Sequence, residues 1–79
     1  MDHKTYWRIE FSGTEDIKVL YHEDGSDASV RTVYNMADER LNDNFQEYAY
    51  LGQPIEIFVE KIDKDDYMVA REEDDFDVF

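Results

Sequence analysis

The sequence contains no cysteine, one proline and three glycines, and none of its apolar runs approaches the length of a membrane span. Without cysteine the chain can form neither a disulfide framework nor a thiolate metal site. Three isolated glycines do not make the glycine-rich loop that cradles phosphates, and a membrane-spanning helix needs about 20 apolar residues. The first residues do not form a signal peptide. We therefore expect a soluble protein of the cell interior.

Basic residues are also scarce. Eight Lys and Arg residues stand against 21 Asp and Glu, which gives a formal net charge of −13. Repulsion among so many like charges opposes a compact fold, and a net charge of about 2–8 in magnitude is enough to keep a small domain soluble. The acid excess therefore favours one of three explanations: solubility, adaptation to high salt, or a positively charged partner.

Large apolar side chains are plentiful by contrast. Of the 79 residues, 42% are hydrophobic and 15% are aromatic, which is too apolar a composition for a disordered acidic segment. Each aromatic side chain can bury about 150–250 Å². The length suits one domain, so we expect a single folded domain over residues 1–79 whose acidic C-terminal tail starts near residue 72.

Alternation of apolar and polar residues predicts a first pair of strands. Residues 5–11 place Thr5, Trp7, Ile9 and Phe11 on one face. Residues 17–22 carry Ile17, Val19 and Tyr21 on one face, and Lys18, Leu20 and His22 on the other. The short polar turn between the two runs indicates an antiparallel hairpin.

Residues 28–51 predict an amphipathic helix, because apolar residues recur there at three- and four-residue spacing. These residues are Val30, Val33, Tyr34, Ala37, Leu41, Phe45 and Tyr48. Ser26 or Asp27 is expected to cap the start of the helix, and Gly52 and Pro54 to end it. An alternative stays open: residues 29–34 have strand propensity, and Asn35 would then cap a shorter helix that begins near Met36.

A second hairpin is expected near the C-terminus. Residues 55–60 alternate in the manner of a strand, residues 63–66 form a turn, and residues 67–71 suit a short fourth strand. The order ββαββ predicts an α+β fold in which one helix packs on one face of a four-stranded antiparallel sheet. The predicted core comprises Trp7, Ile9, Phe11, Ile17, Val19, Leu41, Phe45, Ile57 and Val59.

The sequence does not indicate catalytic chemistry. The only histidines are His3, close to the first residue, and His22, which we expect to be exposed at the end of a strand. Nucleophilic catalysis needs a Ser, Thr or Cys beside a base, and so short a chain leaves little room for a water-excluding pocket. The acidic turns at residues 24–27 and 63–66 lack the ligand pattern of a calcium-binding EF-hand. We expect no enzyme activity, no cofactor and no bound metal.

The acidic side chains form rows. On a continuous helix Glu39, Asp43 and Glu47 are four residues apart, about 6 Å per step, and Asp38 lies beside them. Glu56 and Glu60 share one face of a strand, where positions recur every ~6.6 Å. Phosphates of one DNA strand advance ~3.4 Å per residue along the helix axis, with further separation around it. The two rows therefore present negative charges at spacings comparable to those of neighbouring phosphates.

With its small size, acid excess, lack of cysteine and mixed α+β character, the chain resembles the small phage-encoded inhibitors that imitate DNA, the anti-CRISPR and anti-restriction proteins. The resemblance covers the whole chain but includes no shared motif. It implies a stoichiometric blocker of a positively charged nucleic-acid-binding protein, with a CRISPR effector as the expected target in the cytoplasm of a bacterial host. It implies no direct contact with nucleic acid or membrane.

A second surface is expected on the sheet face opposite the helix, where Tyr6, Leu20, Phe58 and Met68 lie among charges. Phe76, Val78 and Phe79 of the tail, a partner, or a second copy could cover it, so the sequence allows a monomer or a homodimer. Two other functions stay open: a generic acidic domain from a halophile, and an immunity-type inhibitor of a basic toxin or nuclease. The expected partner-binding residues are Asp38, Glu39, Asp43, Glu47, Glu56, Glu60, Tyr6 and Phe58.

Overall fold

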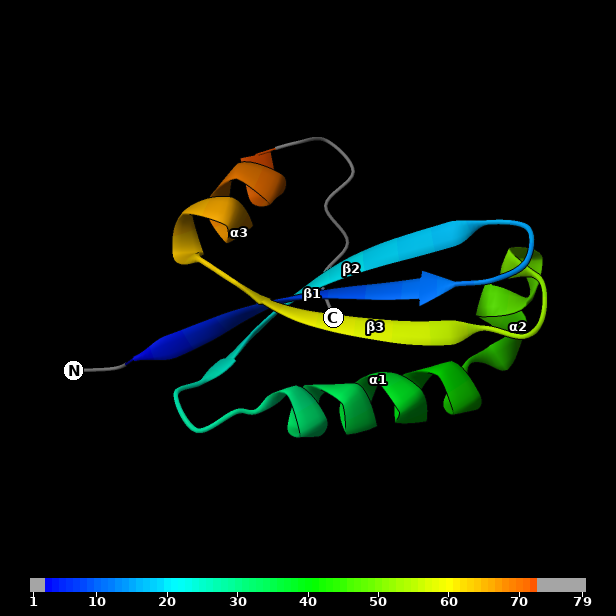
Figure 1. Ribbon diagram of the computed structural model, residues 1–79, viewed down its shortest axis with the longest axis horizontal. Coiled ribbons are helices and arrows are strands. Elements are labelled where there is room, and N and C mark those ends of the chain that lie inside the picture. The colour runs from blue at the N-terminus through cyan, green and yellow to red at the C-terminus, as the bar shows by residue number, and fades with distance from the viewer. Residues whose placement is uncertain (1–2, 73–79) are drawn as a thin grey trace.

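A three-stranded antiparallel sheet forms the centre of the protein (Figure 1). The computed structural model describes residues 3–72. The strands are β1 (Lys4–Ser12), β2 (Ile17–Gly25) and β3 (Glu56–Ile62), in the spatial order β2-β1-β3. The helices are α1 (Val30–Asp43), the single turn α2 (Phe45–Tyr48), the 3-10 turn η1 (Ala49–Leu51) and α3 (Lys64–Glu72). The expected α+β class is confirmed, but the four-stranded sheet with a single helix is wrong.

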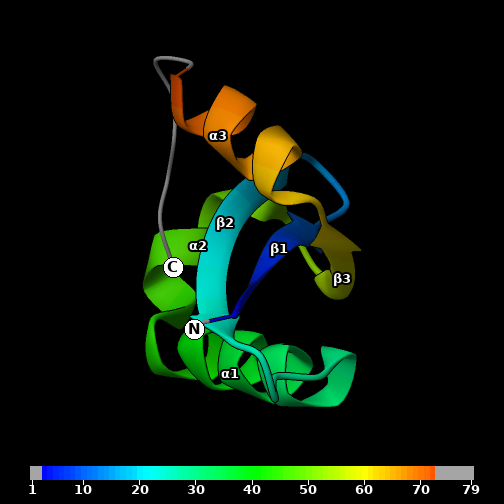
Figure 2. The same ribbon diagram turned by 90° about the vertical axis from the view of Figure 1, so that its left-hand side faces the viewer.

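Helices cover both faces of the sheet. Figure 2 shows α1 on one side of the strands and α3 on the other. The side-chain contacts support this arrangement. Tyr67 of α3 contacts Tyr6 of β1 with ring centroids 4.9 Å apart. The next residue, Trp7, points to the α1 side and is buried in the main core. Within residues 3–72, no helix is both long and apolar enough to cross a membrane.

The main core lies between β1 and α1. Trp7, Ile9 and Phe11 on β1 are at most 2% exposed, which confirms the predicted alternation of this strand. They pack against the buried stripe of α1, which consists of Val33, Ala37 and Leu41. Burying a large apolar side chain contributes roughly 1.5–3 kcal/mol, so these two elements supply most of the driving force for folding.

The core face predicted for β2 is wrong. In the β1–β2 register, Ile9 faces Leu20 and Trp7 faces His22, and directly opposed residues point to the same side of a sheet. Leu20 and His22 are therefore buried, while Ile17 is 54% exposed and Val19 is half-buried on the other face. His22, expected to be exposed, is 7% exposed and lies 2.9 Å (Nε2 to Oδ2) from Asp24.

The helix predicted over residues 28–51 is present, but it is interrupted. Ser29, not Ser26 or Asp27, caps α1, and its Oγ accepts a hydrogen bond from the Thr32 N–H. The alternative strand at residues 29–34 is wrong. At Asn44 the backbone leaves helical geometry (φ −123°, ψ 36°), and α2 and η1 follow. Gly52, in the left-handed region at φ 79°, ends the segment as expected.

The break at Asn44 also changes the core. Phe45, predicted to be buried, is 41% exposed, whereas Tyr48 is fully buried. The Tyr48 ring packs against Phe11 at a centroid distance of 4.9 Å. Its hydroxyl accepts a hydrogen bond of 2.9 Å from Nε of Arg40, so the phenol is anchored at both ends.

The fourth strand predicted at residues 67–71 is wrong, because these residues belong to α3. Asp65 and Asp66 lie in the first turn of α3 and Arg71 in its last, which is the charge order that a helix dipole favours. Only Tyr67 of this helix is buried. Residues 73–79, including most of the expected acidic tail with Phe76, Val78 and Phe79, lie outside the described residues.

Candidate partner-binding surface

The first part of the predicted acidic row is on α1. Asp38, Glu39 and Asp43 are all exposed, and Glu39 lies on the side of the helix opposite the buried stripe. Glu39 and Asp43 are one helical turn apart, about 6 Å along the axis. The structure therefore confirms that these carboxylates are accessible on one helix.

The third member, Glu47, does not continue this row. α1 ends at Asp43, and Glu47 lies in the separate turn α2. The break is stabilised because both the backbone N–H and the side-chain amide of Asn44 donate to the Arg40 carbonyl, at 3.0 and 3.2 Å. Buried Tyr48 holds α2 in place next to it. A regular row of three carboxylates is thus replaced by two carboxylates on α1 and one on α2.

The structure gathers further acids at the end of the molecule where α2 lies. The turn between β1 and β2 is tied to η1, since the N–H groups of Glu15 and Asp16 both donate to the Leu51 carbonyl, at 2.8 and 3.2 Å. Glu56 starts β3 opposite Ser12, the last residue of β1. Figure 1 shows the β1–β2 turn, α2 and the start of β3 at one end of the protein. We call this surface the acidic end; it comprises Glu15, Asp16, Asp43, Glu47 and Glu56.

The acidic end is not neutralised from within the described chain. All five of its carboxylate-bearing residues are exposed, and none forms an ion pair with another residue in the range 3–72. The carboxylates that do form ion pairs in this range are elsewhere: Glu10 with Arg8, Glu23 with Lys4, and Asp24 with His22. The acidic end can therefore offer its full negative charge to a partner.

The remaining predicted residues lie on the sheet face opposite α1. Phe58 is 51% exposed and faces Glu10 across the strands, while Glu60 faces Arg8. Tyr6 is partly covered because α3 packs on it through Tyr67. Met68 is 40% exposed but lies on α3 and not on a strand, and Leu20 is buried on the α1 side of the sheet. Glu56, which faces Ser12, is on this face too, so Glu56 and Glu60 share one face of β3 as expected. The structure therefore places Glu60, Tyr6 and Phe58 on a different face from the acids of α1, and Glu56 joins the acidic end only because it starts β3 at that end of the sheet.

Two carboxyl groups have pKa values below their ordinary range. The side-chain hydrogen bond from Lys4 is the main reason why the pKa of Glu23 is lowered. The pKa of Asp24 is lowered first by its hydrogen bond with His22 and then by the backbone N–H of Gly25. Both groups lie on β2, outside the acidic end, so these two shifts are local features of that strand.

Sequence reasoning missed two features of the surface. Glu15 and Asp16 were not among the predicted partner-binding residues, although a turn between paired strands always lies at an end of a sheet. The signal that was lacking is the packing of η1 on this turn, which no sequence pattern shows. A cluster of basic side chains around α3 was missed as well, because residues 67–71 were expected to form a strand.

No metal site is evident, since the described part of the chain contains no group of three or more His, Asp or Glu side chains placed to hold a metal ion. The chemistry of the surface is therefore that of exposed carboxylates beside a few exposed aromatic rings. Comparisons with protein-family models, with curated proteins and with solved structures found no match.

Proposed function

We propose that this protein is a stoichiometric inhibitor that binds the cationic nucleic-acid channel of another protein, with its carboxylates in the place of phosphates. The observation that carries the proposal is the acidic end. Its five exposed carboxylates come from the β1–β2 turn, α1, α2 and β3, and have no ion-pair partner within residues 3–72. A surface of this kind suits a partner that brings its own Lys and Arg side chains.

The physical basis is the same as for nucleic-acid binding. A protein that binds DNA arranges cations along the phosphate backbone, and much of the affinity is electrostatic and falls as salt rises. Carboxylates spaced about 6 Å apart on α1, with further acids from α2, β3 and the β1–β2 turn, can occupy such cationic positions. The net charge of −13 adds long-range attraction that speeds encounter with a basic channel.

The partner class follows from the resemblance to small phage-encoded inhibitors. A CRISPR effector in the bacterial cytoplasm is the first target to test, because its channel holds guide RNA and target DNA chiefly through positive charge. Blocking that channel needs neither a catalytic residue nor a cofactor. The protein acts at a one-to-one ratio with the channel that it occupies.

The test compares two variants that lose the same charge. The first variant combines Asp43→Asn, Glu47→Gln and Glu56→Gln at the acidic end. The matched control combines Asp27→Asn, Asp65→Asn and Glu72→Gln, three exposed acids outside that surface. Each exposed ion pair contributes about 0.2–1 kcal/mol, so the first variant should bind a purified CRISPR effector roughly 3- to 150-fold more weakly. The control should bind like the wild type.

Binding should be measured at two salt concentrations, with and without competing DNA. We expect affinity to fall steeply with salt and the protein to be displaced by DNA, because both would use the same cations. Equal losses in the two variants, no dependence on salt, or simultaneous binding of DNA and protein would contradict the proposal. Binding would then more simply use the exposed face around Phe58.

A further inference from the structure

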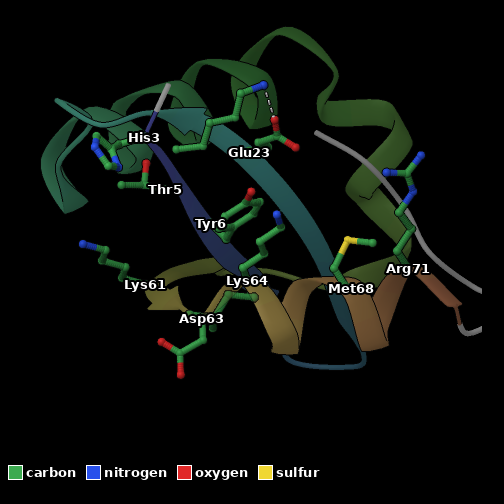
Figure 3. Close-up of a pocket in the computed structure, with 11 residues that line it drawn as sticks. His3, Thr5, Tyr6, Glu23, Lys61, Asp63, Lys64, Met68 and Arg71 are labelled. Atoms are coloured by element: carbon green, nitrogen blue, oxygen red, sulfur yellow. Dashed lines mark hydrogen bonds and ion pairs between the residues drawn. The ribbon is translucent and has the colours of Figure 1, made fainter. Parts of the chain in front are cut away.

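A hollow of about 720 Å³ lies at the other end of the molecule, away from the acidic end (Figure 3). Its walls are the start of β1, the end of β3 and the inner side of α3. This volume falls within the range of ~300–1,000 Å³ that is common for small-molecule sites. The hollow is therefore large enough to hold a ligand rather than a few water molecules.

The charge of this hollow is opposite to that of the rest of the protein. Lys4, Lys61, Lys64 and Arg71 line it, together with His3. Among the described residues that line it, only Glu23 and Asp63 carry carboxylates. In the whole chain, acids outnumber bases by 21 to 8. Half of the Lys and Arg residues of the chain are thus gathered around one hollow.

Most of these cations are not used in ion pairs. Lys4 pairs with Glu23 at 2.6 Å, the dashed line in Figure 3. The described part of the chain provides no ion pair to Lys61, Lys64 or Arg71. In Figure 3 the carboxylate of Asp63 is directed away from Glu23 and Tyr6. Within residues 3–72, these three cations therefore lie at the hollow without a direct ion-pair partner.

Glu23 shows how this environment acts on an anion. Its pKa is lowered mainly by the hydrogen bond from Lys4, and the positive charges of Lys4, Arg71 and Lys64 lower it further. Cations from β1 and from both ends of α3 thus stabilise one negative charge in the hollow. The Glu23 carboxylate therefore already lies where the surrounding positive charges stabilise an anion.

The fold fixes the cations in this arrangement. Lys64, Met68 and Arg71 follow each other at spacings of four and three residues, so they lie on one side of α3. Tyr67 is 5% exposed and packs on Tyr6, which holds that side of the helix against β1. Tyr6, Ile62 and Met68 add apolar surface to the lining of the hollow.

We propose that this basic hollow binds a small phosphate-class polyanion with two linked phosphoryl groups, such as pyrophosphate or the diphosphate of a nucleotide. Three lining cations that form no ion pair within residues 3–72 suit a ligand that carries several charges over two groups. Lysine binds phosphate as a point charge, and arginine can bind two of its oxygens at once. The proposal does not rest on the proposed inhibitor function, because the two surfaces share no residue.

The net charge of the protein does not prevent such binding. The molecule is 41 Å long, whereas charges more than about 10 Å apart are largely screened at 0.1 M salt. At that ionic strength a ligand in the hollow therefore responds mainly to the charges that line it, where Lys and Arg outnumber carboxylates by four to two among the described residues. The acidic end weakens binding only when the salt concentration is low.

The test is a calorimetric titration of the full chain with pyrophosphate at 0.1 M salt, with orthophosphate and citrate as comparison ligands. We expect saturable one-to-one binding of pyrophosphate, and weaker binding of the other two. The double variant Lys61→Gln, Lys64→Gln should bind about tenfold more weakly, the effect of losing two exposed ion pairs. Both lysines are exposed, so circular dichroism should show that this variant folds.

Two matched pairs of variants make the test specific. Arg71→Gln should weaken binding several-fold, whereas Arg31→Gln, an exposed arginine on α1, should not. Glu23→Gln should strengthen binding because it removes a negative charge from the hollow, whereas Glu47→Gln removes the same charge at the acidic end and should have no effect. No saturable pyrophosphate binding up to about 10 mM, equal effects within either pair, or equally tight citrate binding would overturn the proposal.

Discussion

Substitution of the three glycines by alanine gives a sharp test of how the acidic end is built. Gly13 lies in the β1–β2 turn, and a Cβ atom there would collide with the carbonyl of Leu51 and come within 2.6 Å of the Gly52 carbonyl oxygen. Both obstacles are backbone atoms, which cannot rotate away. Gly13→Ala must therefore push η1 off the turn.

The expected cost of Gly13→Ala can be worked out from the contacts that this displacement breaks. The two hydrogen bonds from Glu15 and Asp16 to Leu51 contribute about 0.5–1.5 kcal/mol each, and steric overpacking costs about 1–3 kcal/mol. The total loss is about 2–6 kcal/mol. A domain of 79 residues has a free energy of unfolding of roughly 4–12 kcal/mol, so the variant loses much of its stability.

Gly25→Ala is the matched control. At Gly25 the nearest atom to an added Cβ is a side-chain oxygen of Asp27 at 3.0 Å, which can move. Its cost should stay within about 1 kcal/mol, and the reduced freedom of the unfolded chain can even make it stabilising. Gly52→Ala should resemble Gly13→Ala, because Gly52 has a φ of 79° and a Cβ there would collide with Thr14.

The assay is urea unfolding followed by the fluorescence of Trp7, the single tryptophan, which is 2% exposed. One kcal/mol shifts the melting temperature of a domain of this size by about 4–8 °C, so thermal unfolding should separate Gly13→Ala and Gly25→Ala by about 4 °C or more. Similar stabilities for these two variants would refute the close packing of η1 on the β1–β2 turn.

Three further predictions follow from the core, from β2 and from the net charge. Tyr48→Ala should lose about 3–5 kcal/mol of unfolding free energy. Tyr48→Phe removes only the hydrogen bond from Arg40 and should lose about 0.5–1.5 kcal/mol. Equal losses of the two variants in urea unfolding would contradict the burial of the Tyr48 ring. Because the folded pKa of Asp24 is lowered, its contribution to stability is present above the unfolded value of ~3.9 and is lost as pH falls through the folded value. Asp24→Asn should thus be less stable than wild type at pH 7 and lose less stability on acidification, and parallel melting curves between pH 2 and 7 would argue against this. Circular dichroism should show a folded protein in low-salt buffer, since the core is apolar; folding only near molar salt, where the screening length is ~3 Å, would favour the halophile interpretation.

The outcome for β1 and β2 shows what an alternating pattern can predict. On β1 every large apolar residue of the alternating run falls on the same face, so Trp7, Ile9 and Phe11 were identified correctly. On β2 both faces contain apolar residues, and only the pairing with β1 selects one of them. Because a shift of one residue exchanges the two faces of a strand, local sequence could not decide between Val19 and Leu20.

The helices show a similar limit. The α1 stripe was long enough to identify, whereas residues 67–71 were too few to distinguish a helix from a strand by periodicity. α3 is held by the contact of Tyr67 with Tyr6, which joins residues far apart in the chain. The prediction of a strand also hid the spacing of Lys64, Met68 and Arg71, which is meaningful only on a helix.

By itself the sequence determined the α+β class, the β1–β2 hairpin, the α1 helix and the exposure of the predicted carboxylates, because each depends on periodicity or charge within a short segment. Only the tertiary structure decided how these charges are grouped. The break at Asn44, the packing of η1 on the β1–β2 turn and the register of β3 bring Asp43, Glu47 and Glu56 to one end. The docking of α3 brings Lys61, Lys64 and Arg71 to the other. Such groupings depend on contacts between distant segments, and no local pattern of residues encodes them.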